Sequence, residues 1–380
     1  MLAINRKRYS AGEQITKRLN ALGELHTSSC FGVSLWFISV LVLTGGAWVV
    51  SAMQTLEFAY LLDAVGDTMQ MNTAEKAFVN GSVMIGAFVG SFIFGNLADM
   101  YGRKSMMLAA YSIASIGCAL CAVAQSIEVL AFFRFIAGIG LGGEQPIIGT
   151  LILELSPERV RGRMLVYMDA FWAIGSILAL VLAYEVEPHI GWRYVMAMNL
   201  GFLLYAVLLK VYVPESPKWL AMMGRYEDAV RAMRAIEKSC SIFYDAAMDD
   251  SILNGGGARP GQMQQLAAGQ CNSSSSTVID LGASLRIAQT HKPSFFRVLI
   301  DRFRILFRYP YFSRTMVLWI VCTGMSLTYY GLDIYLLDHL RDSTALVANE
   351  NLVMYGTAVA QIPGYVIAAY MCTPCAHEEE

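Results

Sequence analysis

Two carboxylates interrupt long apolar stretches of the sequence. Glu144 lies about nine residues before the end of one stretch and Asp169 about seven after the start of the next, which at about 1.5 Å per residue places both roughly 10–14 Å deep. Two nearby carboxylates can bind a cation or share a proton, because each raises the pKa of the other. We therefore expect Glu144 and Asp169 to face one aqueous cavity, with Arg134 as a further ion-coupling residue.

A structural role for Glu144 is the alternative. In that interpretation its carboxylate pairs with an arginine and serves helix packing. An ionisable group inside an apolar segment is costly and is by default functional, but a satisfied ion pair lowers that cost. The sequence leaves both interpretations of Glu144 open.

The composition places these stretches in a membrane protein. Of 380 residues, 56% are hydrophobic and 15% charged, with a mean hydropathy of +0.47, whereas soluble domains carry about 25% charged residues. A bilayer-spanning helix needs about 20 apolar residues. Eight runs qualify, at about 33–58, 78–99, 105–125, 128–153, 164–184, 193–213, 314–337 and 351–372.

Charge in the connections predicts the orientation. Basic residues crowd the turns after the second and fourth runs and the long connection after the sixth, whereas the opposite loops are mainly acidic. By the positive-inside rule the N-terminus is cytoplasmic, and the chain is a multi-pass integral membrane protein.

The segments between the runs define the expected domains. These are a basic arm (1–30), a six-helix half (31–213), a cytoplasmic loop (214–313) and a pair of helices with the chain end (314–380). Within the loop, about 224–238 predicts an amphipathic helix, apolar at Ala229, Met233 and Ile236. About 254–280 is rich in Gly, Gln and Ser and predicts disorder.

One charged turn is the most informative motif. Gly95, Asp99, Gly102, Arg103 and Lys104 lie between two spanning runs, where the charges hold the turn in water and Gly102 permits a left-handed or crowded backbone. The pattern G-x-L-x-D-x-x-G-R-K closely resembles the loop between helices 2 and 3 of the major facilitator superfamily of secondary transporters.

Three more motifs narrow the resemblance. Arg134-x-x-x-Gly138-x-Gly140-x-Gly142-Gly143-Glu144 resembles the family's fourth helix, whose small residues allow close packing. Glu154 with Arg161, and the segment from Pro214 to Leu220 (P-E-S-P-K-W-L), resemble the elements after helices four and six. This combination is typical of the sugar-porter, organic-ion-transporter and synaptic-vesicle-protein-like branches.

The resemblance implies the fold. We expect an all-α membrane protein with a major-facilitator-type bundle, made of a complete six-helix N-terminal half and two helices of the second half. No second copy of the charged turn follows the eighth run, so we expect a chain truncated after the eighth helix.

The resemblance also implies roles for individual residues. In the family, the charged turn and its Glu–Arg partners lock the cytoplasmic side, a gating role that would fall here to Gly95, Asp99, Gly102, Arg103, Lys104, Glu154, Arg161 and Glu215. Gln54, Trp172 and Tyr330 fall on central helices of the family layout and, with Trp48, Glu144 and Asp169, are the candidate substrate-binding residues. Simple anchoring by positive charge is the alternative for Arg103 and Arg161.

The first helix departs from its relatives. In the organic-ion and vesicle-protein branches a tryptophan is followed by two acidic residues, whereas here Trp48 is followed by Ser51 and Gln54. Glu57 lies one turn further on. Proton coupling through the first of those acids is therefore not expected.

The expected function is secondary active or facilitative transport of small organic solutes, a sugar or an organic ion or carboxylate, by alternating access. The partners are the lipid bilayer, the solute and a co-transported proton or cation. Basic residues form no separate domain, which argues against nucleic-acid binding, and no motif predicts a cofactor, a metal or an enzyme. The alternative is a truncated, non-transporting protein of the carrier fold that acts as a sensor, scaffold or subunit.

Overall fold

The computed structural model describes residues 11–20, 35–239, 304, 307–308, 311–342 and 350–371, without the side chains of 329–354. Every regular element in these ranges is a helix, which confirms the all-α class. The first elements are α2 (Leu35–Met69), α3 (Thr73–Tyr101), α4 (Arg103–Leu120), η1 (Cys121–Val123), α5 (Ile127–Leu155) and α6 (Arg161–Val181).

Shorter elements complete this part of the chain. The fifth and sixth apolar runs are not single regular α-helices. The π-helical turn η2 interrupts the fifth run, and the 3-10 turn η3 interrupts the sixth. These elements are η2 (Leu182–Val186), α7 (Glu187–Ile190), α8 (Trp192–Met198), η3 (Asn199–Phe202), α9 (Leu203–Tyr212), α10 (Pro217–Met222) and α11 (Tyr226–Ser239).

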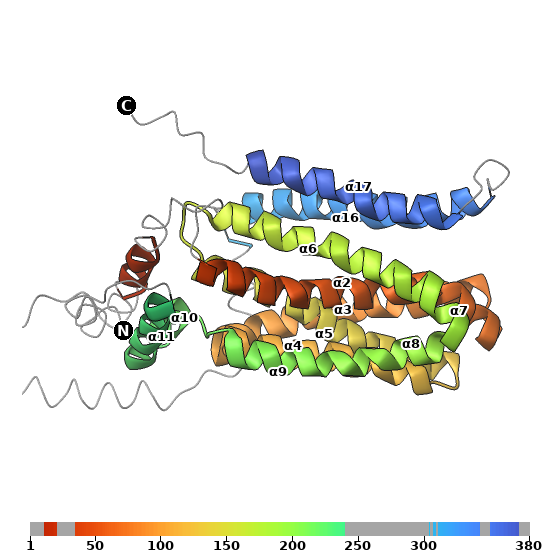
Figure 1. The fold of residues 1–380 in the computed structure, drawn as a ribbon, viewed down its shortest axis with the longest axis horizontal. Helices are drawn as coiled ribbons and strands as arrows, with labels where there is room; N and C mark the ends of the chain where they lie inside the picture. Colours follow the sequence, from red (N-terminus) through yellow and green to blue (C-terminus); the bar gives the residue numbers. More distant parts are fainter. Residues whose placement is uncertain are drawn as a thin grey trace, which may run out of the picture. The chain divides into compact units, whose positions relative to one another are not determined.

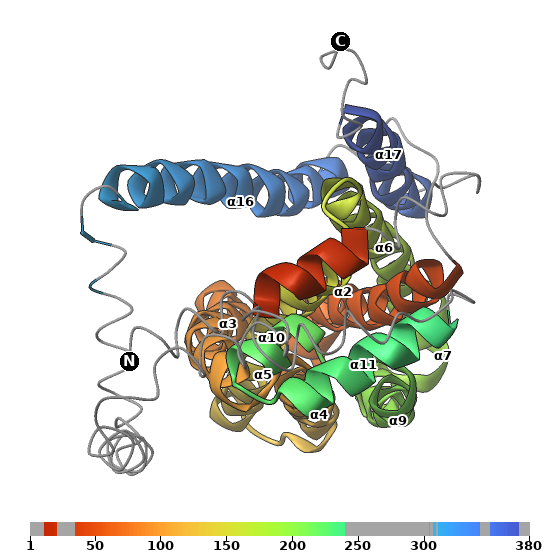
Figure 2. The same cartoon turned by 90° about the vertical axis from the view of Figure 1, so that its left-hand side faces the viewer.

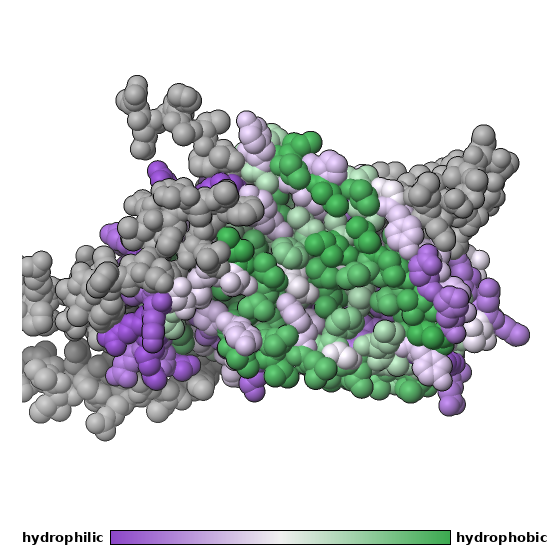
Figure 3. Space-filling view, viewed as in Figure 1, coloured by the Kyte–Doolittle hydropathy of each residue, from purple (hydrophilic) through white to green (hydrophobic). Residues whose placement is uncertain are grey.

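Six helical segments in the described residues are long and apolar enough to cross a membrane. Hydrophilic residues gather towards both ends of the bundle, with apolar side chains between them (Figure 3). The first six predicted runs are thereby confirmed. Their bounds are Trp36–Met69, Thr73–Tyr101, Arg103–Val123, Ile127–Leu155, Arg161–Ile190 and Trp192–Tyr212.

The first two spans are longer than predicted. Asp63, expected in a loop, lies in α2, where it pairs with Lys76 of α3 at 2.9 Å. Asn72 caps α3 in a capping box with Glu75, so the connection is only a short turn. A helix can continue beyond its apolar run into water when ion pairs and capping side chains bind the polar groups at its end.

The last two predicted runs are also helical. They form α16 (Tyr311–Asp342) and α17 (Glu350–Met371). The part of α17 from Ala358 to Met371 is a shorter apolar helix. The chain separates into two compact units, and α16 belongs to the smaller one, Ala258–Glu350. The predicted disordered segment at about 254–280 lies outside the described residues.

The helices α3 and α5 lie side by side (Figures 1 and 2), and glycines allow them to pack closely. A Cβ added to Gly90 would lie 2.0 Å from the carbonyl oxygen of Ile139, and one added to Gly142 would lie 2.1 Å from that of Ala87. Backbone cannot yield at such distances, so these positions require glycine. The predicted close packing by small residues of the fourth span is confirmed.

A helical layer lies at one end of the bundle, where α10 and α11 are found (Figure 1). The predicted amphipathic helix is confirmed as α11, whose Ala229, Met233 and Ile236 are all buried. Residues 11–20 form an unpredicted helix whose Ile15 joins the same cluster. Two further contacts hold this N-terminal helix: Arg18 pairs with Glu237 of α11 at 2.6 Å, and Asn20 binds Glu158.

Candidate functional site

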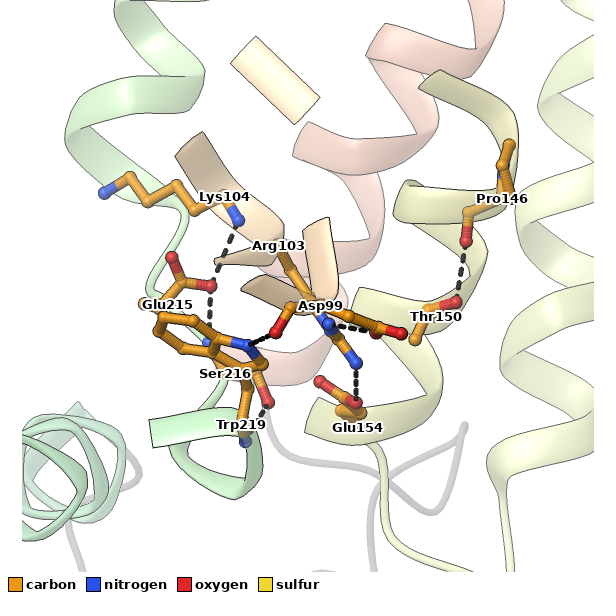
Figure 4. A network of polar contacts seen from close by, with 9 residues as sticks. All are labelled: Asp99, Arg103, Lys104, Pro146, Thr150, Glu154, Glu215, Ser216 and Trp219. Carbon is orange, nitrogen blue, oxygen red and sulfur yellow. Dashed lines mark hydrogen bonds and ion pairs between the residues drawn. The ribbon is translucent and has the colours of Figure 1, made fainter. Parts of the chain in front are cut away.

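The charged turn between α3 and α4 is held by ion pairs centred on Arg103 (Figure 4). One guanidinium nitrogen lies 2.6 Å from the Asp99 carboxylate and the other lies 3.2 Å from that of Glu154, at the end of α5. The Arg103 side chain is only 11% exposed. Such partly buried pairs are more costly to break than surface pairs.

The segment after α9 closes on the same turn. Glu215 accepts a hydrogen bond at 3.0 Å from the backbone N–H of Lys104, and Trp219 donates its indole N–H to the carbonyl of Asp99 at 2.9 Å. Gly102 has φ +110°, and a Cβ there would lie 2.5 Å from Glu215 Oε2. The expected special backbone at Gly102 is therefore confirmed, for reasons of both conformation and space.

We call Asp99, Arg103, Glu154, Glu215 and Trp219 the turn cluster. It ties α3, α5 and α10 together within the first six-helix half. A contact within one half stabilises that half as a rigid body, and it does not by itself join two halves. The gating role of these residues stays a prediction.

Besides Gly102, three residues of the predicted gate are not part of the turn cluster. Arg161 donates only a long bond of 3.5 Å to the Ser156 carbonyl and has no ion pair among the described residues. Lys104 donates its backbone N–H to Glu215, and its side-chain charge also acts on that carboxylate. A Cβ added to Gly95 would meet no atom within 4 Å.

Replacing Arg103 by alanine should loosen the turn cluster. Glu154 would lose its ion-pair partner in a mostly buried position, and an unpaired group of this kind costs about 1–3 kcal/mol. We expect a lower unfolding midpoint for purified Arg103→Ala and faster proteolysis at the turn. Arg159→Ala, which removes an exposed arginine outside the turn cluster, is the matched control; equal losses in both variants would contradict the assignment.

A second group of polar side chains lies deep in the bundle. Glu57 of α2, Arg134 of α5 and Asn199 of η3 are each at most 1% exposed. The Asn199 amide donates to both Glu57 oxygens, at 3.2 and 3.3 Å. Three helical segments thus meet at one buried carboxylate.

Arg134 contributes positive charge to this group without a direct ion pair. Its charge acts on Glu57, yet no ion pair within 4 Å joins the two. The Cys118 thiol is the hydrogen-bonding group beside the guanidinium, whose nitrogens bind no oxygen among the described residues. The guanidinium stacks on the Phe58 ring at 4.1 Å. A buried guanidinium with free donors is suited to a carboxylate or other planar anion.

Asn199 was missed by the sequence analysis. A polar amide inside an apolar run was the available signal, and a search of every span for such residues would have found it. Glu57 was noted only as lying one turn beyond Gln54. Its pairing with Asn199 joins positions 142 residues apart, which local sequence patterns do not reveal.

The predicted substrate-binding residues fall into separate places. Gln54 is 2% exposed and donates to the Ser115 hydroxyl at 3.2 Å. Trp48 and Trp172 are brought together, edge to face, with ring centroids 6.2 Å apart. Tyr330 lies on α16, and its side chain is outside the described residues.

Glu144 and Asp169 occupy different environments. Glu144 is fully buried, facing Ser51 of α2, whereas Asp169 is exposed on α6. No contact between the two carboxylates is recorded, and a shared cavity stays a prediction. Among the described residues no group of three His, Cys, Asp or Glu side chains could hold a metal ion.

A family model described as "Sugar (and other) transporter" matches residues 29–252. The chain is 29% identical to the niacin transporter NiaP of Acinetobacter baylyi, over 88% of this chain and 66% of that protein. It is 26% identical to synaptic vesicle glycoprotein 2B of Rattus norvegicus, over 82% of this chain and 45% of that protein. The chain therefore spans about half to two thirds of the length of these relatives.

A solved structure shares the fold. The partially occluded inward-open form of the xylose transporter XylE from E. coli has a TM-score of 0.55 and 18% identity, over 89% of this chain and 87% of that one. At this identity the likeness concerns the fold alone. It agrees with the major-facilitator-type bundle expected from the sequence motifs.

Proposed function

Because the chain belongs to the sugar (and other) transporter family, we propose that it carries small organic solutes across a membrane by alternating access. The main support is that Arg134 and Glu144 are fully buried in a membrane-spanning helix without an ion-pair partner among the described residues. Such groups are expensive in a bilayer and generally mark a solute or ion pathway. Packing alone gives no reason to retain them.

Alternating access suits the arrangement of the first half. Close glycine contacts and the turn cluster make α3, α4 and α5 a rigid unit that can rock as one body. In transporters of this architecture the solute lies between two such bundles near the middle of the membrane. The turn cluster would preserve the shape of one bundle during rocking.

Among small organic solutes, we propose a carboxylate rather than a sugar as the transported class. The buried Arg134 guanidinium has free donors that a carboxylate can accept. The Acinetobacter baylyi relative is named as a niacin transporter, and niacin is a small aromatic carboxylate. Trp48 and Trp172 supply aromatic surface in the same half.

Uptake of labelled solutes into cells expressing the chain tests the proposal. Nicotinate, a hexose and a quaternary ammonium solute should be compared, with an empty vector as background. We expect nicotinate to accumulate above background and the others to accumulate less. Uptake of the hexose alone would overturn the carboxylate class, and no uptake by a chain that reaches the membrane would favour the sensor or scaffold alternative.

Ion coupling is proposed through Arg134, Glu144 and Asp169, with a proton or cation as the second partner. Asp169→Asn removes the charge of the exposed carboxylate while keeping its size. If this group shares the coupling site, uptake should fall and its dependence on external pH should change. Uptake and a pH profile both equal to those of the parent chain would contradict a role for Asp169.

We also propose that the N-terminus faces the cytoplasm. The support is the excess of arginine and lysine at the charged turns, which the positive-inside rule assigns to that side. An epitope tag at the N-terminus should bind antibody only after cells are permeabilised. Binding to intact cells would reverse the orientation.

A further inference from the structure

Several buried polar groups with few partners converge beside Glu144, away from the Glu57 group. The Glu144 carboxylate has no basic partner and only the Ser51 hydroxyl as a hydrogen-bonding group beside it, and the Tyr111 hydroxyl has no hydrogen-bond partner among the described residues. Glu144 and Ser51 are each 0% exposed and Tyr111 is 1% exposed. Buried polar atoms are nearly always satisfied, so a buried carboxylate with so few polar partners requires an explanation.

The three side chains come from three helices that pack together, α2, α4 and α5. Ser51 faces the Glu144 carboxylate, and the Tyr111 hydroxyl feels the charge of the same carboxylate. Trp48, one turn before Ser51 on α2, carries another buried donor without an acceptor. Ser51 and Tyr111 thus approach Glu144 from adjacent helices rather than from its own.

No basic side chain balances Glu144. Arg134 lies ten residues earlier on α5, about 15 Å along the helix axis. From α4 the titratable group is Tyr111, with Tyr205 behind it, and from α2 the facing group is the neutral Ser51. On the α3 side, Gly143 packs against the apolar ring of Phe94.

A fully buried carboxylate without a basic partner is neutralised either by taking up a proton or by binding a metal cation, because an isolated charge at such a depth is prohibitively costly. Oxygen ligands favour a proton or a hard cation over a soft metal. We propose that Ser51, Tyr111 and Glu144 form a buried site for one monovalent cation, either a proton or Na⁺. Its role as the coupling ion rests on the proposed transport function, whereas the binding itself does not.

The sodium arm of the test uses the purified full chain. The unfolding midpoint is measured in NaCl and in choline chloride at equal ionic strength, since a ligand of the folded state raises it. If Na⁺ is the ion, it should stabilise the parent chain and Glu128→Gln, an exposed carboxylate on the same helix, but not Glu144→Gln. Ser51→Ala should weaken the apparent Na⁺ affinity at least about tenfold, the effect of losing an oxygen that contacts the ion.

The proton arm applies if Na⁺ has no effect. Infrared difference spectra between acid and alkaline buffer should then contain the carbonyl band of a protonated buried carboxyl, absent in Glu144→Gln and retained in Glu128→Gln. Ser51→Ala should move the pH midpoint of that band. This second variant keeps the test decisive if Glu144→Gln does not fold.

One result overturns the site: Na⁺ has no effect on the parent chain, and its infrared spectra equal those of the Glu144→Gln variant. A chain that binds the ion but takes up no solute contradicts the proposed function and leaves the site in place. Nicotinate uptake by the parent chain, together with a Glu144→Gln variant that matches the parent in both the sodium and the infrared measurements, would contradict the cation site and leave the transport function in place. The failures of the two proposals are therefore distinguishable.

Discussion

Replacing Arg134 by methionine is expected to lower the free energy of unfolding by about 1–3 kcal/mol, the typical cost of leaving a buried polar group without compensation. Arg134 and Glu57 are both 0% exposed, and methionine keeps the apolar stem while removing the charge. Glu57 would then keep only the amide of Asn199 as a polar partner. Denaturant unfolding of the purified variant in detergent measures the loss.

The double variant Arg134→Met with Glu57→Gln is the control. Glutamine can still accept from Asn199, and no buried charge remains, so most of the stability should return. Uptake should stay low in both variants if Arg134 contacts the solute. A double variant as unstable as the single one would show that Arg134 serves packing on Phe58 rather than charge compensation.

Replacing Trp219 by alanine should also lower the free energy of unfolding. Trp219 is 6% exposed, and the loss of a buried tryptophan typically costs about 3–5 kcal/mol. Its indole N–H also binds the Asp99 carbonyl, so its removal detaches α10 from the charged turn. The measurements are the unfolding midpoint and the rate of protease cleavage between α9 and α11.

Trp219→Phe separates the two contributions. Phenylalanine keeps most of the apolar contact and loses only the hydrogen bond, worth about 1 kcal/mol. We expect a small decrease for Trp219→Phe and a large one for Trp219→Ala. If the alanine variant is as stable and as protease-resistant as the parent chain, Trp219 does not hold the turn.

The sequence predicted best where local rules decide the structure. Apolar run length revealed the first six spans, and glycine spacing in the fourth span revealed its close packing. The left-handed backbone at Gly102 followed from its place in a tight turn. The helical spacing of apolar residues was enough to place Ala229, Met233 and Ile236 on the buried face of α11.

Long-range pairings could not be obtained in this way. Arg18 meets Glu237 across 219 positions, and Glu57 meets Asn199 across 142. Neither pair has a local signature, because each forms only when distant helices have packed. The helix at 11–20 was missed for the same reason: its apolar residues are too few to predict a helix without the surface that buries them.

The first helix shows how a structure can change a sequence interpretation. Ser51 and Gln54 suggested that this helix had lost the acidic residues of similar proteins. Glu144 of α5 faces Ser51 from the neighbouring helix. A carboxylate is therefore present at this place in the bundle, supplied by a different element.

Uptake of labelled nicotinate into liposomes containing the purified full chain tests the central claim most directly. The account predicts accumulation above that of empty liposomes, saturation with rising solute and loss of uptake in Arg134→Met with Glu57→Gln. Folded, membrane-inserted chain that accumulates neither nicotinate nor any other small organic solute would contradict it.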